Sequence, residues 1–358
     1  MTNAESDFIL YMEDDNTLEG ENTLDGYFPK EEKRKISRVG LAFFVMLAAT
    51  AVVTSVLQML VSYFAPQLAE KDWYVWVLSM LPMYVVGLPL CILLIRRVPK
   101  LEFERRDMTF GQFLTAIVMC FGIMYPLSLV GNLLSMLFGA LTGGGVNPIE
   151  AAVNSSSPLM TLIFAVILGP VLEEILFRGL IVSRLRRYGD KAAIIFSAAV
   201  FALYHGNFFQ LFYAFGLGLF FAFIYARTGK LRYTIGLHMI VNFIGAFVSS
   251  IVTDKLDVDG IQETARSALE GGFGAGDVAQ LGGSLGSAAL FALYAQILLG
   301  LTVAGVILLI VKRRRFVCMP GPVTIPKGRM FNALFLNVGF ILFFCACLVM
   351  IIVSLFAG

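Results

Sequence analysis

Long apolar runs dominate the chain, and polar stretches separate them at fairly regular intervals. Most runs reach the roughly 20 residues that an α-helix needs to cross the hydrocarbon core of a bilayer. A backbone that faces lipid must satisfy its own hydrogen bonds, so each run is predicted to be helical. The pattern predicts nine segments, at about 39–65, 73–95, 112–141, 158–182, 192–206, 208–226, 233–252, 286–311 and 331–357.

Two of these segments lie unusually close together. Residues 192–226 offer only 35 residues for two crossings, which is less than two full lengths. Either these helices are short and the bilayer thins around them, or the turn near Gly206 and Asn207 lies inside the protein. A buried turn at membrane depth is tolerated only where it lines a cavity. The sequence leaves both arrangements open.

The composition agrees with a membrane protein. Of the 358 residues, 58% are apolar and 15% are charged, whereas soluble domains are about 45–50% apolar and about 25% charged. This balance excludes a soluble enzyme and a disordered chain. The five cysteines are expected to be packing residues rather than a disulfide framework. The predicted fold class is an all-α, polytopic transmembrane helix bundle with about eight or nine spans.

The basic residues predict the orientation of this bundle. If the N-terminus is cytoplasmic, the cytoplasmic segments hold 23 of the 27 Lys and Arg residues, and the opposite loops hold only Lys71, Lys255 and Arg266. This asymmetry follows the positive-inside rule. We therefore expect a multi-pass protein of the cell membrane with a cytoplasmic N-terminus. As a separate expectation, we take this membrane to be a bacterial plasma membrane. The one remaining basic residue, Arg178, lies inside the fourth segment.

Ionisable side chains inside the apolar segments are few, and they are clustered in the sequence. Of the 25 Asp and Glu residues, only Glu173 and Glu174 fall within a segment, beside Arg178, and the only two histidines, His205 and His238, also lie in apolar runs. Such residues cost about 2.5–3.5 kcal/mol each on insertion scales, so each is a functional candidate.

Helical spacing predicts which of these side chains can cooperate. Glu174 and Arg178 are four residues apart, so they share a face and can pair, whereas Glu173 points about 100° away. His238 and Asn242 share a face in the same way and present a pair of donors. On a separate helix, His205 follows Phe201 by four residues.

Each feature alone also has a purely structural interpretation. A buried Arg–Glu pair can lock two helices together, a single His can be a packing residue, and an Asn can join helices. Packing does not predict, however, that both histidines, both membrane carboxylates and the membrane arginine fall in three consecutive clusters. The combination therefore favours an active site.

Two chemistries fit these residues. In the first, a Glu activates water for attack on an amide while a His and the Asn amide donate to the developing oxyanion. This chemistry requires no cofactor. In the second, Glu173, His205 and His238 bind a catalytic zinc and leave a fourth position for water. The compact H-E-x-x-H spacing is absent, so the metal-free chemistry is preferred and zinc is the alternative.

The three clusters resemble the motifs of the CPBP family, the CAAX protease and bacteriocin-processing (Abi) family of intramembrane endopeptidases. This family is related to the Ras-converting CAAX endopeptidase. Its pattern E-E-x-x-x-R, F-x-x-x-H and H-x-x-x-N reads here as Glu173 to Arg178, Phe201 to His205, and His238 to Asn242. The resemblance covers about residues 158–252, roughly a quarter of the chain.

The resemblance implies a role for each matching residue. Glu173 is similar to the general base that activates water, and His205 to its partner in holding that water. His238 and Asn242 are similar to the residues that stabilise the oxyanion. The supporting residues that it implies are Glu174, Arg178 and Phe201.

The implied enzyme is a CAAX-type endopeptidase, of glutamic or metallo type, that cleaves a membrane-anchored peptide or protein. We expect its water-filled cavity to open to the cytoplasm or sideways to lipid, and we expect no nucleic acid as a partner. The alternative functions are a transporter and a non-proteolytic immunity or scaffold protein. A repeat-built transporter would show a second copy of the motifs, and an inactive scaffold would have lost a reactive position; the sequence shows neither.

These inferences divide the chain into five regions. They are an acidic cytoplasmic tail (1–38), three N-terminal membrane helices (39–157), a catalytic membrane core with the three motifs (158–252), a glycine-rich outer loop (253–285) and two C-terminal membrane helices (286–358).

Overall fold

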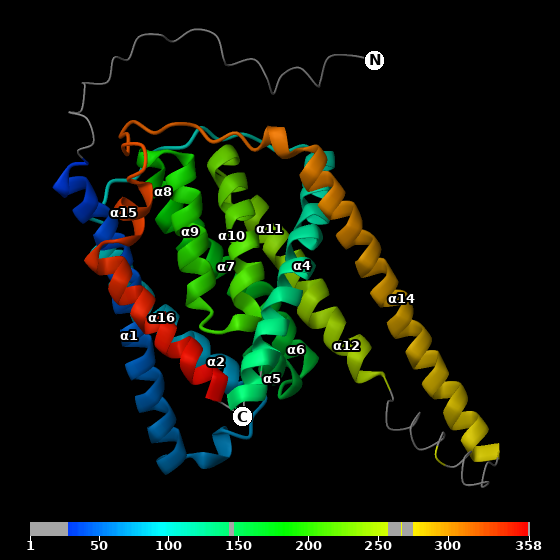
Figure 1. Ribbon diagram of the computed structural model, residues 1–358. Helices are drawn as coiled ribbons and strands as arrows, with labels where there is room; N and C mark the ends of the chain where they lie inside the picture. The colour runs from blue at the N-terminus through cyan, green and yellow to red at the C-terminus, as the bar shows by residue number, and fades with distance from the viewer. Residues whose placement is uncertain (1–27, 143–146, 257–265, 267–274, 357–358) are drawn as a thin grey trace, which may run out of the picture.

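The computed structural model describes residues 28–142, 147–256, 266 and 275–356, with only the backbone for 275–282. The described chain is an all-α bundle without β-strands (Figure 1). Its first half contains α1 (Lys30–Phe64), η1 (Pro66–Leu68), α2 (Tyr74–Pro82), η2 (Met83–Gly87), α3 (Leu88–Ile95), α4 (Phe110–Thr142), α5 (Pro148–Asn154), α6 (Pro158–Met160), η3 (Thr161–Leu168), α7 (Gly169–Glu174) and η4 (Ile175–Val182).

The second half continues without a change of class. It contains α8 (Ser183–Leu185), η5 (Arg186–Tyr188), α9 (Asp190–Tyr204), α10 (Phe208–Thr228), α11 (Leu231–Asn242), η6 (Phe243–Val248), α12 (Ser249–Asp254), α14 (Ala275–Val311), η7 (Arg313–Arg315), α15 (Met330–Phe335) and α16 (Val338–Phe356). The η elements are short 3₁₀ or π turns.

Eight helices of the described chain are long and apolar enough to cross a membrane. They span Lys30–Phe64, Tyr74–Ile95, Phe110–Thr142, Pro158–Tyr188, Phe208–Thr228, Leu231–Asp254, Gly283–Val311 and Val338–Phe356. The ninth predicted segment corresponds to α9, which has only 15 residues. The predicted fold class, an all-α multi-pass bundle of eight or nine spans, is confirmed.

The two ends of the bundle differ in charge. At the top of Figure 1 lie the start of α1, the loop after α3, α8 with the start of α9, and the connection from α14 to α15. These segments carry the clustered Lys and Arg residues, and we call this the basic end. The opposite end holds α5, α6 and the end of α16, and we call it the α5 end. The charge pattern predicts that the basic end is cytoplasmic.

The first helix begins earlier than the expected boundary of the acidic tail. α1 starts at Lys30, and Ile36 on it is fully buried. Glu32 fixes this first turn, because its carboxylate accepts hydrogen bonds from Lys35 Nζ at 2.8 Å and from the Tyr188 hydroxyl at 2.6 Å. Residues 30–38 are therefore part of the bundle rather than the tail, whereas residues 1–27 lie outside the described residues.

Two other boundaries also move. α14 begins at Ala275, inside the stretch expected to be an outer loop, and residues 257–265 and 267–274 of that stretch lie outside the described residues. The last predicted segment is broken, because Asn337 Nδ2 donates to the Leu334 carbonyl at 2.8 Å while its Oδ1 accepts from Phe340 N at 3.0 Å. This side chain ends α15 and starts the membrane-length helix α16 at Val338.

Residues 316–325 form a strap across the basic end (Figure 1). The Asp190 carboxylate, at the start of α9, accepts hydrogen bonds from Met319 N at 2.9 Å and from Arg186 Nε at 2.7 Å. In addition, Val323 N donates to the Arg187 carbonyl at 2.9 Å. The strap is thus fastened directly over the turn between α8 and α9 at the basic end.

The close pair of segments is a hairpin with a buried turn. α9 leaves the basic end and stops at Tyr204, and α10 returns from Phe208 after the turn His205–Asn207. Asn207 is buried and caps α10 by accepting from Gln210 N at 2.9 Å. Gly206 has φ of 63°, and a Cβ there would lie 2.7 Å from Met350 Cε. Of the two arrangements left open, the structure has the internal turn.

Candidate active site

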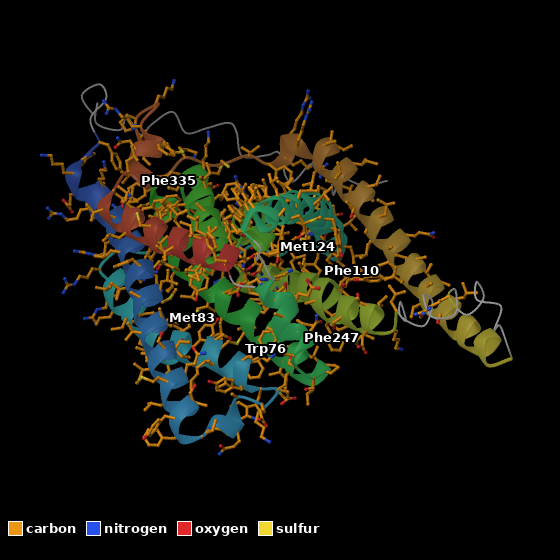
Figure 2. All side chains as sticks on the ribbon, turned by 60° about the horizontal axis from the view of Figure 1, so that its bottom comes forward. Trp76, Met83, Phe110, Met124, Phe247 and Phe335 are labelled. Carbon is orange, nitrogen blue, oxygen red and sulfur yellow. The ribbon has the colours of Figure 1, made fainter. Side chains whose placement is uncertain are left out.

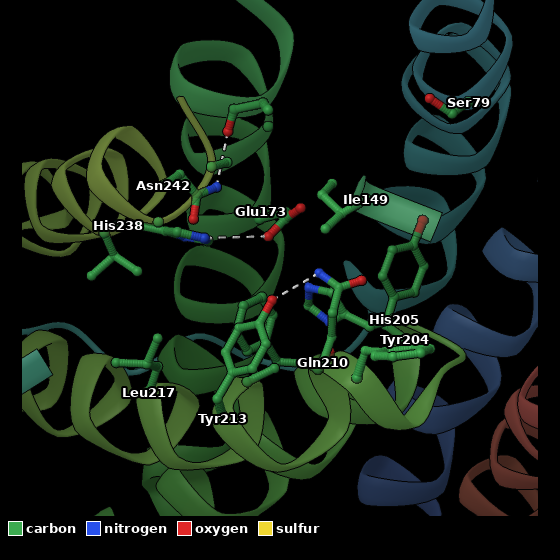
Figure 3. Close-up of a pocket in the computed structure, with 18 of the residues that line it drawn as sticks. Ser79, Ile149, Glu173, Tyr204, His205, Gln210, Tyr213, Leu217, His238 and Asn242 are labelled. Carbon is green, nitrogen blue, oxygen red and sulfur yellow. Dashed lines mark hydrogen bonds and ion pairs between the residues drawn. The ribbon is translucent and has the colours of Figure 1, made fainter. Parts of the chain in front are cut away.

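The four residues expected to be catalytic line one cavity in the centre of the bundle (Figure 3). Glu173 lies on α7, His205 at the end of α9, and His238 and Asn242 on α11, and all four face a space of about 810 Å³. Its walls also include α1, α2 and α4, which lie outside the region expected to form the core. The three motifs therefore furnish the polar side of the cavity, while the N-terminal helices complete it.

A distorted helix presents the two adjacent carboxylates. The short α7 lies between two π-helical stretches, η3 and η4, and π turns are often found at functional sites. The Glu173 side chain is 22% exposed and faces the cavity, whereas the Glu174 side chain is 0% exposed. As their spacing predicts, the two side chains point in different directions, and of the two only Glu173 faces the cavity.

Glu174 forms a buried ion pair with Arg178. The Arg178 Nη1 atom lies 3.1 Å from Glu174 Oε1, and both side chains are 0% exposed. The guanidinium lies 4.4 Å from the ring centre of Phe201 and 5.4 Å from that of Phe221. These rings partly replace water around the cation. The Phe201 ring thus covers Arg178, and the Phe201 backbone carbonyl also contacts the His205 ring.

His238 lies between the two carboxylates. Its Nδ1 atom is 3.0 Å from Glu174 Oε1, and its Nε2 atom is 3.7 Å from Glu173 Oε2. Because Glu174 is paired with Arg178 and accepts at Oε1, the geometry favours a proton on Nδ1 and turns Nε2 toward the cavity. The sequence placed His238 beside Asn242 on one helix face but did not indicate that Glu174 orients its ring.

His205 ends α9 at the buried turn. Its Nδ1 atom lies 2.8 Å from the Phe201 carbonyl oxygen, so Nε2 is the ring nitrogen left for the cavity. Among the described residues, this is the hydrogen bond that the His205 side chain makes. The structure therefore brings His205 to the same cavity as Glu173 but does not join the two side chains directly.

Asn242 reaches the cavity because a proline leaves a carbonyl without its donor. In the π-helical stretch η3, Gly169 N donates to the Phe164 carbonyl five residues earlier. The next donor in this pattern would be Pro170, which has no N–H. The Ala165 carbonyl instead accepts from Asn242 Nδ2 at 2.9 Å. This bond fixes the Asn242 amide at the cavity wall and leaves its second N–H free for a ligand.

Gln210 and Tyr213, which the sequence analysis did not identify, line the cavity and belong to a chain of polar groups. Asn207 Nδ2 donates to Gln210 Oε1 at 3.0 Å, and Gln210 Nε2 donates to the Tyr213 hydroxyl at 3.1 Å. Tyr204, directly before His205, also lines the cavity. One sequence feature could have indicated these residues. Asn207 and Gln210 lie in or just after the predicted turn, and an internal turn would bring such side chains close to the cavity.

The zinc alternative requires three converging ligands. Among the described residues, no group of three or more His, Cys, Asp or Glu side chains could hold a metal ion. His238 Nδ1 is already bonded to Glu174, and His205 Nδ1 to a carbonyl. As arranged, these described side chains do not converge as zinc ligands.

The cavity extends away from the basic end, whereas the sequence led us to expect an opening to the cytoplasm or sideways to lipid. Its lining includes Trp76 near the start of α2, and Asn147 and Ile149 at the start of α5, all at the α5 end. Toward the basic end, the Arg178 layer and buried Phe177 close the bundle. Helix lengths alone could not predict this, because packing around Arg178 decides which half is solid.

The fold and these side chains define a multi-pass membrane protein with an internal Glu–His site. Residues 155–244, which contain all three motifs, match the family model of type II CAAX prenyl endopeptidase Rce1-like proteins. This match makes the segment similar to the CAAX protease (CPBP) family. It is also 28% identical over 162 residues to "Putative membrane peptidase YdiL" of Bacillus subtilis (strain 168).

That similarity covers 44% of this chain and 66% of the Bacillus relative, so the two proteins are compared over just under two thirds of the relative's length. No solved structure matches the chain significantly. The family match thus rests on the segment with the three motifs, and the helices outside it are described by the present structure alone.

Proposed function

We propose that this protein is an intramembrane endopeptidase that cleaves membrane-anchored peptides or proteins, and that it works in a bacterial plasma membrane. The observation that carries the proposal is the different exposure of the two adjacent acids. Glu173 is 22% exposed in the cavity and Glu174 is fully buried in an ion pair. A general base must reach water, and only Glu173 does.

In the proposed reaction, a water molecule lies between Glu173 and His205. The Glu173 carboxylate takes a proton from this water while its oxygen attacks the carbonyl carbon of the substrate peptide. A tetrahedral oxyanion forms, and the proton on Glu173 then passes to the nitrogen of the leaving amine as the C–N bond breaks. Glu173 returns to its ionised form, so the cycle is balanced.

His238 and Asn242 stabilise the oxyanion in this proposal. Nδ1–H of His238 donates to Glu174, so a donation from Nε2 requires a doubly protonated ring. Such a ring would be compatible with the local charges. Glu173, Glu174 and Arg178 together carry one net negative charge, which an imidazolium would balance. The free N–H of Asn242 supplies the second donor. Glu174 and Arg178 act through His238 and are positioning residues.

The test compares the purified wild type with Glu173→Gln, which keeps the side-chain size but removes the base. Both are incubated with membrane-anchored and CAAX-like peptides, with and without a zinc chelator. We expect cleavage by the wild type and at least a hundredfold loss in the variant, since general base catalysis contributes about 10²–10⁴-fold. Glu150→Gln, an exposed acid on α5, is the matched control and should cleave normally.

Equal cleavage by Glu173→Gln and the wild type would contradict the assignment of Glu173 as the base. Chelator sensitivity would favour the zinc alternative. If a folded wild-type preparation cleaves none of the peptides, the non-proteolytic alternatives gain support.

A further inference from the structure

The side of the membrane from which a substrate enters depends on where the cavity ends. Trp76, Met83 and Met124 all line the cavity, and they surround the centre of the bundle in the view toward the α5 end (Figure 2). The lining continues outward to Asn147 and Ile149. The cavity therefore runs from the middle of the bundle to the α5 end.

The half of the bundle on the basic side is closed. Arg178, directly beyond Glu173 along the same helix, is fully buried and lies against Phe201 and Phe221. Beyond this layer, apolar side chains of α1, η4 and α9 pack together without exposure, including Phe43, Phe177, Ile181 and Phe196. The strap is then fastened over α8 and α9 by the Asp190 hydrogen bonds. A peptide could not reach Glu173 from this side without disrupting the core.

The cavity wall between the site and the α5 end is neutral. Among the described residues that line it, the only Asp, Glu, His, Lys or Arg side chains are Glu173, His205 and His238. The remaining polar lining is uncharged, and the hydroxyls of Thr50 and Tyr84 are buried without a hydrogen-bond partner in the described chain. Such groups suit the peptide bonds of an extended, uncharged segment, because unpaired buried hydroxyls gain from bonding a backbone.

We propose that substrates enter from the non-cytoplasmic side of the membrane, and that the bond cleaved lies in an uncharged segment next to a membrane anchor on that side. The positive-inside pattern places the basic end in the cytoplasm, and the cavity ends at the opposite face. A cytoplasmic tail would meet the closed half of the bundle. This inference rests on the proposed peptidase function for the nature of the ligand, but the direction of access is a separate property.

Access is tested first without any substrate, by cysteine labelling. Ser128→Cys, deep on the cavity wall of α4, and Ser79→Cys, near the α5 end of α2, are the probes. Cys318, exposed on the strap, is a natural reporter of the basic end, and Cys345→Ala removes the other exposed thiol. A membrane-impermeant maleimide is applied to intact cells and to inverted vesicles.

We expect both introduced cysteines to react in intact cells and to be protected in inverted vesicles, and Cys318 to show the reverse. Labelling of Ser128→Cys only in inverted vesicles would overturn the proposal, as would labelling of Cys318 in intact cells, which would invert the orientation. Protection of Ser128→Cys in both preparations would show that the cavity is closed to the non-cytoplasmic side, and would also overturn it.

Cleavage provides a second readout. Two reporters carry one membrane anchor and the same uncharged stretch, placed on either side of the anchor. In detergent, both should be cut by the wild type and neither by Glu173→Gln; no cutting in detergent would contradict the peptidase function and leave the labelling result intact. In cells, we expect cutting of the non-cytoplasmic reporter alone. Cutting of the cytoplasmic reporter alone would overturn the direction of access while supporting the peptidase.

Discussion

The buried pair Glu174–Arg178 allows a quantitative test of how the site is held. Glu174→Gln keeps an oxygen that can accept from His238 Nδ1, which lies 3.0 Å from Glu174 Oε1, but it removes the negative charge. Arg178 would then be a fully buried cation without its counter-charge. The substitution therefore isolates the electrostatic contribution of the pair from the hydrogen bond that orients the histidine.

The expected loss of stability follows from the burial of both partners. Breaking a buried ion pair by removing one charge costs about 3–5 kcal/mol, because the other charge stays desolvated. The contacts of Arg178 with the Phe201 and Phe221 rings persist in the variant, and a desolvated cation over a ring gains about 2 kcal/mol. We therefore expect a loss near the lower limit, about 3 kcal/mol.

The assay is thermal unfolding in detergent across a double-mutant cycle. A change of about 3 kcal/mol corresponds to a fall of about 5 °C in Tm, since long chains shift by less than about 2 °C per kcal/mol. Arg178→Met should lose a similar amount, because it leaves the Glu174 carboxylate buried. The double variant Glu174→Gln/Arg178→Met has no orphaned charge and should unfold within about 2 °C of the wild type.

Simple additivity would refute this reasoning. If the double variant loses the sum of the two single losses, the two side chains do not compensate each other and the ion pair is not what stabilises them. An unchanged Tm in Glu174→Gln alone would likewise mean that Arg178 is solvated or paired in another way.

Two further predictions concern single hydrogen-bonded groups. Asn242→Ala should lower stability by about 1–3 kcal/mol, because it leaves the Ala165 carbonyl without a donor; adding Pro170→Ala restores an N–H to the helix, and Tm should recover at least in part. On the basic end, the hydrogen bond from Lys230 lowers the pKa of Asp107 to about 2 from its usual 3.8. The ionised carboxylate therefore stabilises the fold above about pH 4 and loses this effect as the pH falls through 2, so the Tm difference between the wild type and Asp107→Asn should shrink over that range. It should also shrink in high salt, because the group is exposed. A difference that grows toward low pH would contradict the pairing.

The sequence alone determined the class of fold and the order of the motifs. Membrane insertion depends on the hydropathy of each segment by itself, so the apolar runs could be found one at a time. Helical periodicity likewise fixed that Glu174 pairs with Arg178 four residues later, and the structure has this pair at 3.1 Å. The grouping of Glu173, His205, His238 and Asn242 around one cavity also followed from the sequence, through the resemblance of the three motifs to a family.

Other features were decided by contacts between segments far apart in the chain. The ring of His238 is oriented by Glu174, 64 residues away, and Asn242 is fixed by a carbonyl that Pro170 leaves unpaired on another helix. The turn at Gly206 is internal because α16 packs against it through Met350. No local sequence pattern predicts such pairings. For this reason Gln210 and Tyr213 were not identified as cavity residues from the sequence.

The direction of the cavity is the clearest case of a property that only the tertiary structure decided. Hydropathy places Glu173 near the middle of its helix, but it does not predict which half of the bundle is densely packed. In the structure, the buried layer around Arg178 and the strap over Asp190 fill the basic half, and the space remains toward α5. Side-chain packing depends on the shapes of all the helices at once, so it cannot be read from any one segment.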